Sequence, residues 1–368
     1  METVDEDDIV IDPNIPIEVA RSVLSQRGVV WARAMRPGMS GASVFQCQLA
    51  SGDMLALKRW PDGTGLARIR EVHQVVQQAK NSGCELVPTI HPVAVGTENS
   101  PQTVFSHQQS HWDLTQWMPG EPASVAAVSD PATLDQVRSG AAVIARFHAS
   151  VRSLGVRQQP PPAVLARLKR LCELESLVPQ AIDLAAPLAS AQEISAELHR
   201  AIHEAGRLLH WKWNEVSRRI ARSLSQYQIS SVPIQYVLRD IHRDHILFTD
   251  REPTGLIDFD AVRMDTPATD LARWVGSFSV KPGKSSEMAI EKVWDAALAG
   301  FQRENLLKSC PESDLHVGLA RDLCFATTWI SLANWLVWVL CQQRAFPVGQ
   351  DAVAGRIGEL VSVAKQGI

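Results

Sequence analysis

The sequence has no excess of basic residues, because 36 lysines and arginines are set against 40 aspartates and glutamates. The formal net charge of -4 gives the chain no overall attraction to a polyanion. A nucleic acid is therefore not expected as the main partner. The sequence also has no internal repeat, and its low-complexity content is limited to the three prolines at 160–162. A composition with 45% hydrophobic residues is ordinary for a folded globular protein.

Cysteines are few and scattered. The chain has 6 of them, with no CxxC pair and no spacing with histidine that is typical of a zinc site. This pattern favours reduced thiols in a cytosolic protein. The N-terminal stretch METVDEDDIV is acidic where a secretory signal peptide is basic and then apolar. We therefore expect a cytoplasmic protein without a membrane partner.

The longest candidate for a membrane span is an uncharged stretch of 21 residues from Leu323 to Gln343, which is long enough to cross a bilayer. Threonine, serine and asparagine interrupt the stretch, and its three tryptophans lie towards the middle instead of at the two ends. A buried helix is therefore favoured over a membrane span.

Residues 1–120 have the pattern of a small mixed lobe. Residues 31–58 are strand-like, with a turn at Ser51-Gly52 that is typical of a hairpin. The stretch ARIREVHQVVQQAKNSG, residues 67–83, has the apolar spacing of a helix and ends at a glycine. Short strands are expected around VPTIHPVAVG and TVFSH.

Residues 121–368 are expected to form a larger, mainly helical lobe. Helical patterns cover DQVRSGAAVIARFHASV and the amphipathic run from about Ile194 to Tyr227, and the prolines at 160–162 break the chain between them. Strands are expected in HILFT and TGLIDFDAV, followed by a helical C-terminal third. The tryptophans of HWKWNEV are expected to pack inside the protein, although aromatic faces could also hold a cation.

The stretch LRDIHRDHILF, residues 238–248, offers two aspartates as a catalytic base. Asp244 ends a His-Arg-Asp tripeptide, which opens the catalytic loop of protein kinases. Asp240 lies 18 residues before Asp258, which follows an apolar run in Ile257-Asp258-Phe259. Transfer of a phosphoryl group needs one carboxylate near the acceptor hydroxyl and another that holds a metal on the phosphates.

With Asp240 as the base, this stretch resembles the catalytic loop of the aminoglycoside phosphotransferase and choline kinase-like small-molecule kinase family. The interval to Asp258 matches the one between the two aspartates of that family, and the later DTPATDLAR is similar to its DPxxDLA element. The resemblance implies an α+β, two-lobed protein-kinase-like fold. It implies a nucleotide-binding lobe with an antiparallel sheet over residues 1–120, and a helical lobe with the catalytic loop at 238–248 and a metal-binding strand at 255–260.

Two positions depart from the family pattern. Leu238 stands where the family has a histidine whose polar contacts brace the loop. His245 stands where the family has an asparagine that binds magnesium. Imidazole is a softer ligand than an amide oxygen, so manganese would suit this site better than magnesium.

The resemblance also implies a set of nucleotide-binding residues in the first lobe. Backbone groups of the turn in RPGMSGASVF would approach the phosphates, Lys58 would contact them, and Glu71 would hold Lys58. The segment between the lobes would face adenine. The residues implied are Gly38, Ser40, Gly41, Ser43, Lys58, Glu71, Gln116, Trp117 and Met118.

The resemblance therefore implies a kinase that moves the terminal phosphoryl group of ATP or GTP to a hydroxyl of a small molecule. Asp240 would be the catalytic base, and Asp258 and His245 would hold magnesium or manganese. The main alternative is a pseudokinase that binds nucleotide without turnover; a scaffold that binds no nucleotide is a third possibility. Two simpler interpretations also stay open: both aspartates as turn residues, and Lys58 with Glu71 as a surface pair.

Overall fold

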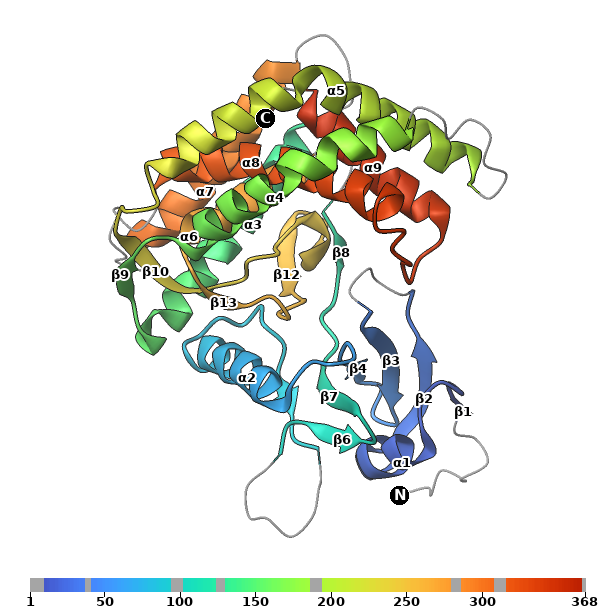
Figure 1. Ribbon diagram of the computed structural model, residues 1–368. Coiled ribbons are helices and arrows are strands. Elements are labelled where there is room, and N and C mark those ends of the chain that lie inside the picture. The colour runs from blue at the N-terminus through green and yellow to red at the C-terminus, as the bar shows by residue number, and fades with distance from the viewer. Residues whose placement is uncertain are drawn as a thin grey trace. The chain divides into compact units, whose positions relative to one another are not determined.

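The computed structural model describes residues 10–36, 41–93, 102–123, 130–185, 194–278, 286–307 and 316–365. The chain forms two compact units, Met1–Pro119 and Gly120–Ile368. Figure 1 shows strands in the first unit and most of the helices in the second.

The described residues of the first unit form a seven-stranded sheet in the order β1-β2-β3-β4-β7-β5, with β6 also paired to β7. Neighbouring strands are antiparallel, except that β1 runs parallel to β2. The strands are β1 Val10–Ile11, β2 Val29–Ala34, β3 Ser43–Leu49, β4 Met54–Arg59, β5 Ile90–His91, β6 Phe105–His107 and β7 Ser110–Gln116. The helical segments are α1 Ile17–Val19, a π-helical turn Ala20–Leu24, a 3-10 turn Ser25–Arg27, and α2 Leu66–Asn81.

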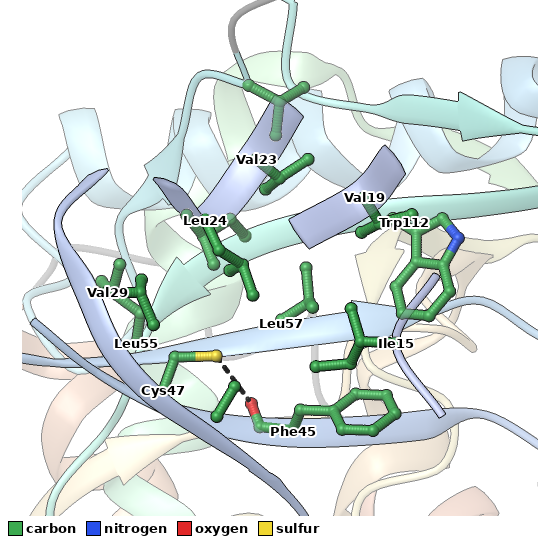
Figure 2. Packing of buried hydrophobic residues seen from close by; sticks show 13 residues of the cluster. Ile15, Val19, Val23, Leu24, Val29, Phe45, Cys47, Leu55, Leu57 and Trp112 are labelled. Atoms are coloured by element: carbon green, nitrogen blue, oxygen red, sulfur yellow. Dashed lines mark hydrogen bonds between the residues drawn. The ribbon is translucent and has the colours of Figure 1, made fainter. Parts of the chain in front are cut away.

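The expected hairpin is confirmed by β3 and β4. Its turn contains Gly52 at φ +91°, a backbone conformation that favours glycine. Alternate residues of the two strands point into the core, which is why Phe45 and Cys47 are buried on β3 and Leu55 and Leu57 on β4. Figure 2 shows these side chains together with those of the N-terminal helical segments. The core of the first unit is therefore closed by the segment before β2.

The second unit has seven helices in its described residues: α3 Pro131–Val151, α4 Pro162–Ala185, α5 Ala196–Ser225, α6 Pro267–Gly276, α7 Ser286–Leu307, α8 Val317–Leu340 and α9 Gln350–Ala364. Two small sheets accompany them, in the orders β13-β10-β9 and β12-β11-β8. Their strands are β8 Glu121–Pro122, β9 Arg157–Gln159, β10 Val232–Val237, β11 Ile246–Thr249, β12 Glu252–Leu256 and β13 Arg263–Asp265. The proline run ends where α4 begins, as expected for a residue without a backbone N–H.

Helix α8 contains most of the uncharged stretch that begins at Leu323. By length and composition it could cross a membrane, but 67% of its most apolar stretch is buried inside the protein. The helix packs against α4, α5, α6 and α9. It therefore lies in the interior of the second unit, as expected. On α5, Trp213 is buried as predicted, whereas Trp211 is exposed.

Helix α6 is held closely against α3. Gly140 of α3 leaves room for the ring of Trp274, because a Cβ at this glycine would overlap the indole. The indole Nε1 donates a hydrogen bond of 3.0 Å to the carbonyl oxygen of Val137. Thr266 caps the N-terminus of α6, and Pro267 follows it. These contacts fix the position of the polar side chains that α6 presents to the loop after β10.

Candidate functional site

The loop that follows β10 is held at both ends by α6. The carboxylate of Asp270 accepts the N–H of Leu238 at 2.7 Å and the N–H of Arg239 at 2.6 Å. Further along the loop, the N–H of Arg243 donates to the hydroxyl of Ser277 at 3.0 Å. The loop that carries the two candidate aspartates is therefore fixed by one helix.

Asp270 is fully buried, and its third partner is His148 of α3, whose Nε2 lies 2.8 Å from Oδ2. The bonds to this carboxylate compensate for its burial. They also hold Arg239 at φ +65°, a conformation that is rare for residues other than glycine. The leucine at position 238 therefore does not leave the loop without support, because its backbone makes the polar contact that its side chain cannot make.

Replacing Asp270 by alanine should destabilise the second unit and loosen the loop. The change leaves the buried N–H of Leu238, the partly buried N–H of Arg239 and the buried His148 without their acceptor. We therefore expect a loss of about 3 kcal/mol in the free energy of unfolding. The measurement is denaturant unfolding, with Asp135→Ala as the control. Asp135 pairs with Arg138 and Arg251 at the surface, and its loss should cost less than about 1 kcal/mol. Similar losses in both variants would contradict this account of Asp270.

Asp240 lies on the exposed side of the loop, with 56% of its side chain accessible, and it pairs with Arg273 of α6 through Oδ1. The same helix thus supplies the acceptor for the loop backbone and a cation for the loop carboxylate. Oδ2 of Asp240 makes no hydrogen bond within the part of the chain that the structure describes. One carboxylate oxygen is therefore held by arginine, and more than half of the side chain is accessible.

Asp244 has different surroundings. Its Oδ2 lies 3.4 Å from Nδ1 of His242, and its Oδ1 lies 3.6 Å from Nε of Arg243. The hydrogen bond with His242 is the main reason why the pKa of Asp244 is lowered. Both of its oxygens thus face cationic or polar neighbours from its own turn. The choice of Asp240 as the base stays a prediction.

Asp258 and His245 lie next to each other. Asp258 follows β12, which ends at Leu256, so residues 257–260 lie beyond the strand that was expected over 255–260. The chain turns there because Asp258 has φ +62°. Its Oδ2 lies 3.4 Å from Nε2 of His245, the last residue of a 3-10 turn, Arg243–His245, that directly precedes the hairpin.

His245 is neutral at physiological pH. Burial lowers its pKa to about 4, and the neighbouring His242 adds to this effect. The centroids of the two imidazole rings lie 3.6 Å apart, with the ring planes tilted by 40°. Nδ1 of His245 is buried and has no hydrogen-bond partner among the described residues. A neutral imidazole has a lone pair for a metal, whereas a protonated one does not.

The pair of side chains fits a divalent cation. Two ligands at about 2.1 Å from one ion, at right angles, are about 3 Å apart, close to the 3.4 Å between Asp258 Oδ2 and His245 Nε2. No group of three or more His, Cys, Asp or Glu side chains converges for a metal in the described part of the chain. The pair would therefore contribute two ligands, and nucleotide phosphates and water would complete the shell.

In the first unit, two of the residues expected near the phosphates, Gly38 and Ser40, lie outside the described residues. Gly41 has φ +80°, and a Cβ there would lie more than 4 Å from the heavy atoms of the described residues other than its chain neighbours. Ser43 begins β3. The backbone at Gly41 can therefore be approached closely, as a phosphate-binding turn requires.

Lys58 and Glu71 lie on β4 and α2. The ammonium of Lys58 lies 4.5 Å from the centroid of the Trp60 ring, and Glu71 accepts a hydrogen bond of 2.7 Å from Arg68. Both residues make further interactions. Their role toward a nucleotide, and their pairing with each other, stay predictions.

At the end of β7, two of the backbone N–H groups expected near adenine already have hydrogen-bond partners. The N–H of Gln116 donates to the carbonyl oxygen of Thr89 at 2.8 Å, and that of Trp117 donates to Met54 at 3.1 Å. The N–H of Met118 has no partner among the described residues. Of the three residues expected to face adenine, Met118 therefore has a backbone donor that the described protein atoms do not use.

Arg273 belongs to the site, although no motif in the sequence pointed to it. Its position three residues after Asp270 on α6 places both side chains on one helix face, so both reach the same loop. That spacing is visible in TDLARW and could have indicated the arginine. The contribution of Ser277 depends on the end of α6, which the sequence pattern does not define.

Several solved structures have a similar fold. An aminoglycoside phosphotransferase from Alicyclobacillus acidocaldarius is 19% identical, with 96% of this chain and 97% of that chain covered and a TM-score of 0.52. An amicoumacin kinase, solved in complex with AMP-PNP, Ca2+ and Ami, is 11% identical, with 96% and 94% covered and a TM-score of 0.58. A glucosamine kinase, solved with glucosamine, ADP and phosphate, is 15% identical, with 88% and 78% covered and a TM-score of 0.57. These similarities confirm the expected two-lobed protein-kinase-like α+β fold.

No curated protein sequence matches this chain significantly. A family model does match it, over residues 35–304, and its description is the phosphotransferase enzyme family. This match contains the loop with Asp240, the hairpin that leads to Asp258, and helix α6. The resemblance found in the sequence is therefore confirmed, and the chain belongs to the phosphotransferase enzyme family.

Proposed function

We propose that the protein transfers the terminal phosphoryl group of ATP, or of another nucleoside triphosphate such as GTP, to a hydroxyl of a small molecule. The observation that carries the proposal is the arrangement of Asp240 and Asp258 around one braced loop and hairpin. Asp240 is exposed at the loop, and Asp258 follows the hairpin beside a neutral His245. A base and a metal-binding carboxylate are the two carboxylate roles that phosphoryl transfer requires.

Asp240 is the proposed catalytic base. Arg273 holds Oδ1, which leaves Oδ2 to accept the proton of the acceptor hydroxyl. The hydroxyl oxygen forms a bond to the terminal phosphorus, and the bond from that phosphorus to the bridging oxygen breaks. The nucleoside diphosphate leaves with the electron pair of the broken bond. The interval between Asp240 and Asp258, and the fixed loop backbone, support this assignment over one in which Asp244 is the base.

Asp258 and His245 are the proposed ligands of magnesium or manganese. A bound cation would neutralise charge on the phosphates. On the first unit, Lys58, the turn that includes Gly41 and Ser43, and the backbone near Met118 are proposed to bind the nucleotide. We also propose a cytoplasmic location, where nucleoside triphosphates are available.

The acceptor is proposed to be a small hydroxyl compound, such as an aminoglycoside, an amino-alcohol or a sugar. The solved relatives include enzymes whose named substrates are aminoglycosides, amicoumacin and glucosamine. Their shared feature, a hydroxyl on a small molecule, supports the general class.

Nucleotide and metal binding test the proposal directly. A thermal-shift panel with ATP and GTP, each with magnesium, manganese or EDTA, should show stabilisation that depends on both nucleotide and metal. Binding followed by turnover supports the kinase. Binding without turnover favours the pseudokinase, and no stabilisation by any combination would contradict both.

Manganese should support more nucleotide binding than magnesium in the wild type. The reason is that the imidazole nitrogen of His245 suits the softer ion, and we expect a preference of about threefold or more. The variant His245→Asn supplies an amide oxygen instead and should narrow or reverse the preference. The measurement is a nucleotide titration with each metal, with His203→Asn on the exposed side of α5 as the control. The same metal preference in all three proteins would show that His245 is not a ligand of the metal.

A further inference from the structure

A cavity of about 30 Å³ lies in the second unit, between α6, α8 and α9 and beside the loop after β10. Its polar lining consists of two arginines, one histidine and several hydroxyl groups. These cationic and hydroxyl-bearing residues include His242, Arg273, Ser277, Thr327, Thr328 and Arg356. No carboxylate lines this cavity among the described residues.

The cavity adjoins the proposed base. Arg273 lines it and also pairs with Asp240, and His242 lines it two residues after Asp240. A group bound in the cavity would therefore lie one side chain away from the carboxylate that is proposed to receive the proton. Most of the Asp240 side chain is exposed, so the rest of a bound molecule would have access to it from solvent.

Three carboxylates lie outside the lining and pair with its cationic residues or with Arg243. Asp244 lies 3.4 Å from His242 and 3.6 Å from Arg243. Asp240 is held by Arg273, and Glu359 accepts from Arg356 at 3.1 Å and from Arg243 at 2.8 Å. One acid on α9 is thus shared between two guanidinium groups. The lining itself therefore offers guanidinium and hydroxyl donors, while the acids lie outside it.

Two further features strengthen the positive character of the cavity. Nε of Arg273 is buried and has no hydrogen-bond partner among the described residues. The partly buried Arg167 reaches the cavity wall, where its Nε donates to the hydroxyl of Thr327 at 2.8 Å. An arginine donor without an acceptor costs free energy, and the charge of an anion beside the same guanidinium would offset part of that cost.

We propose that this cavity binds an anionic group, a carboxylate or phosphate, on the hydroxyl-bearing acceptor. The acceptor would then be an anionic small molecule and not a polycation such as an aminoglycoside. This inference rests on the proposed function. The cavity has room for about one or two water molecules, so it can accept one small group and not a whole substrate. Arginine and hydroxyl donors recognise carboxylate and phosphate oxygens, whereas the amines of a polycation would be repelled there.

The test compares three sugars with the same ring: D-glucuronate, D-glucose and D-glucosamine. Isothermal titration of the full-length protein at fixed ionic strength should give a dissociation constant for D-glucuronate at least about tenfold below those of the other two. Arg356→Gln should weaken D-glucuronate binding by about tenfold and leave D-glucose binding unchanged. Arg321→Gln is the matched control, since Arg321 of α8 pairs with Glu291 and does not line the cavity.

The assignment would be overturned if D-glucosamine bound as tightly as D-glucuronate or more tightly, or if D-glucuronate did not bind. It would also be overturned if both arginine variants lost the same amount of D-glucuronate affinity. A separate measurement of nucleoside diphosphate release distinguishes this failure from that of the proposed function. Binding of D-glucuronate without turnover of any sugar would support the anion site and contradict the kinase. Turnover of D-glucosamine alone would support the kinase and contradict the anion site.

Discussion

Replacing Asp240 by alanine is expected to abolish phosphoryl transfer while nucleotide binding survives. The side chain is the proposed acceptor for the hydroxyl proton, and loss of a general base lowers turnover by about 10²- to 10⁴-fold. The nucleotide and metal are proposed to contact other residues, so their dissociation constants should change little. The measurement is release of nucleoside diphosphate together with a nucleotide titration on the same preparation.

Asp244→Ala is the matched control for this prediction. Asp244 lies on the same loop and has similar exposure, with 55% of its side chain accessible, but its partners are His242 and Arg243 of its own turn. Turnover should therefore remain measurable in this variant. Loss of activity in Asp244→Ala with retention in Asp240→Ala would show that the base has been assigned to the wrong aspartate.

Replacing Asp258 by asparagine should weaken metal-dependent nucleotide binding by at least about tenfold. The change removes the negative charge that faces the proposed cation. Asparagine is preferred to alanine because Asp258 has φ +62°, which asparagine tolerates better. The substitution then removes the charge of Asp258 and disturbs the backbone at this position little.

The measurement for Asp258→Asn is a nucleotide titration with manganese, with magnesium, and with EDTA. The three curves separate the metal-dependent part of binding from the rest. In EDTA the variant and the wild type should bind alike, because the carboxylate is not proposed to touch the nucleotide itself. Equal binding of the two proteins with both metals would place the cation elsewhere.

The local elements of this fold could be predicted from the sequence. Short-range periodicity and turn residues predict three of these elements. They are the hairpin around Ser51-Gly52, helix α2 and the long amphipathic helix α5. The hairpin that begins at Ile246 was also expected, but its second strand ends at Leu256. The strand stops early because a residue at positive φ cannot continue the pleat, and the sequence pattern does not show this φ value.

The side-chain partners in the site could not be predicted in the same way. The pairing of Asp240 with Arg273 joins residues 33 apart, and Asp270 joins α6 to both the loop and α3. Such contacts depend on how the helices pack. For α3 and α6, the packing depends on Gly140, which leaves room for the ring of Trp274. The low pKa of His245 likewise depends on its burial next to His242, which residue order alone does not give.

The central claim is that the chain transfers a phosphoryl group from a nucleoside triphosphate to a small-molecule hydroxyl. Phosphorus NMR of the full-length protein with ATP and manganese tests it most directly. The acceptors are D-glucuronate, D-glucose, D-glucosamine and one aminoglycoside, each offered to the wild type and to Asp240→Ala. The account predicts a new phosphomonoester signal and equal ADP formation with the wild type, most strongly for D-glucuronate, and neither signal with the variant. ATP that binds but gives no phosphomonoester with any acceptor would contradict the claim. A signal of equal size in both proteins would contradict the role of Asp240 as the base.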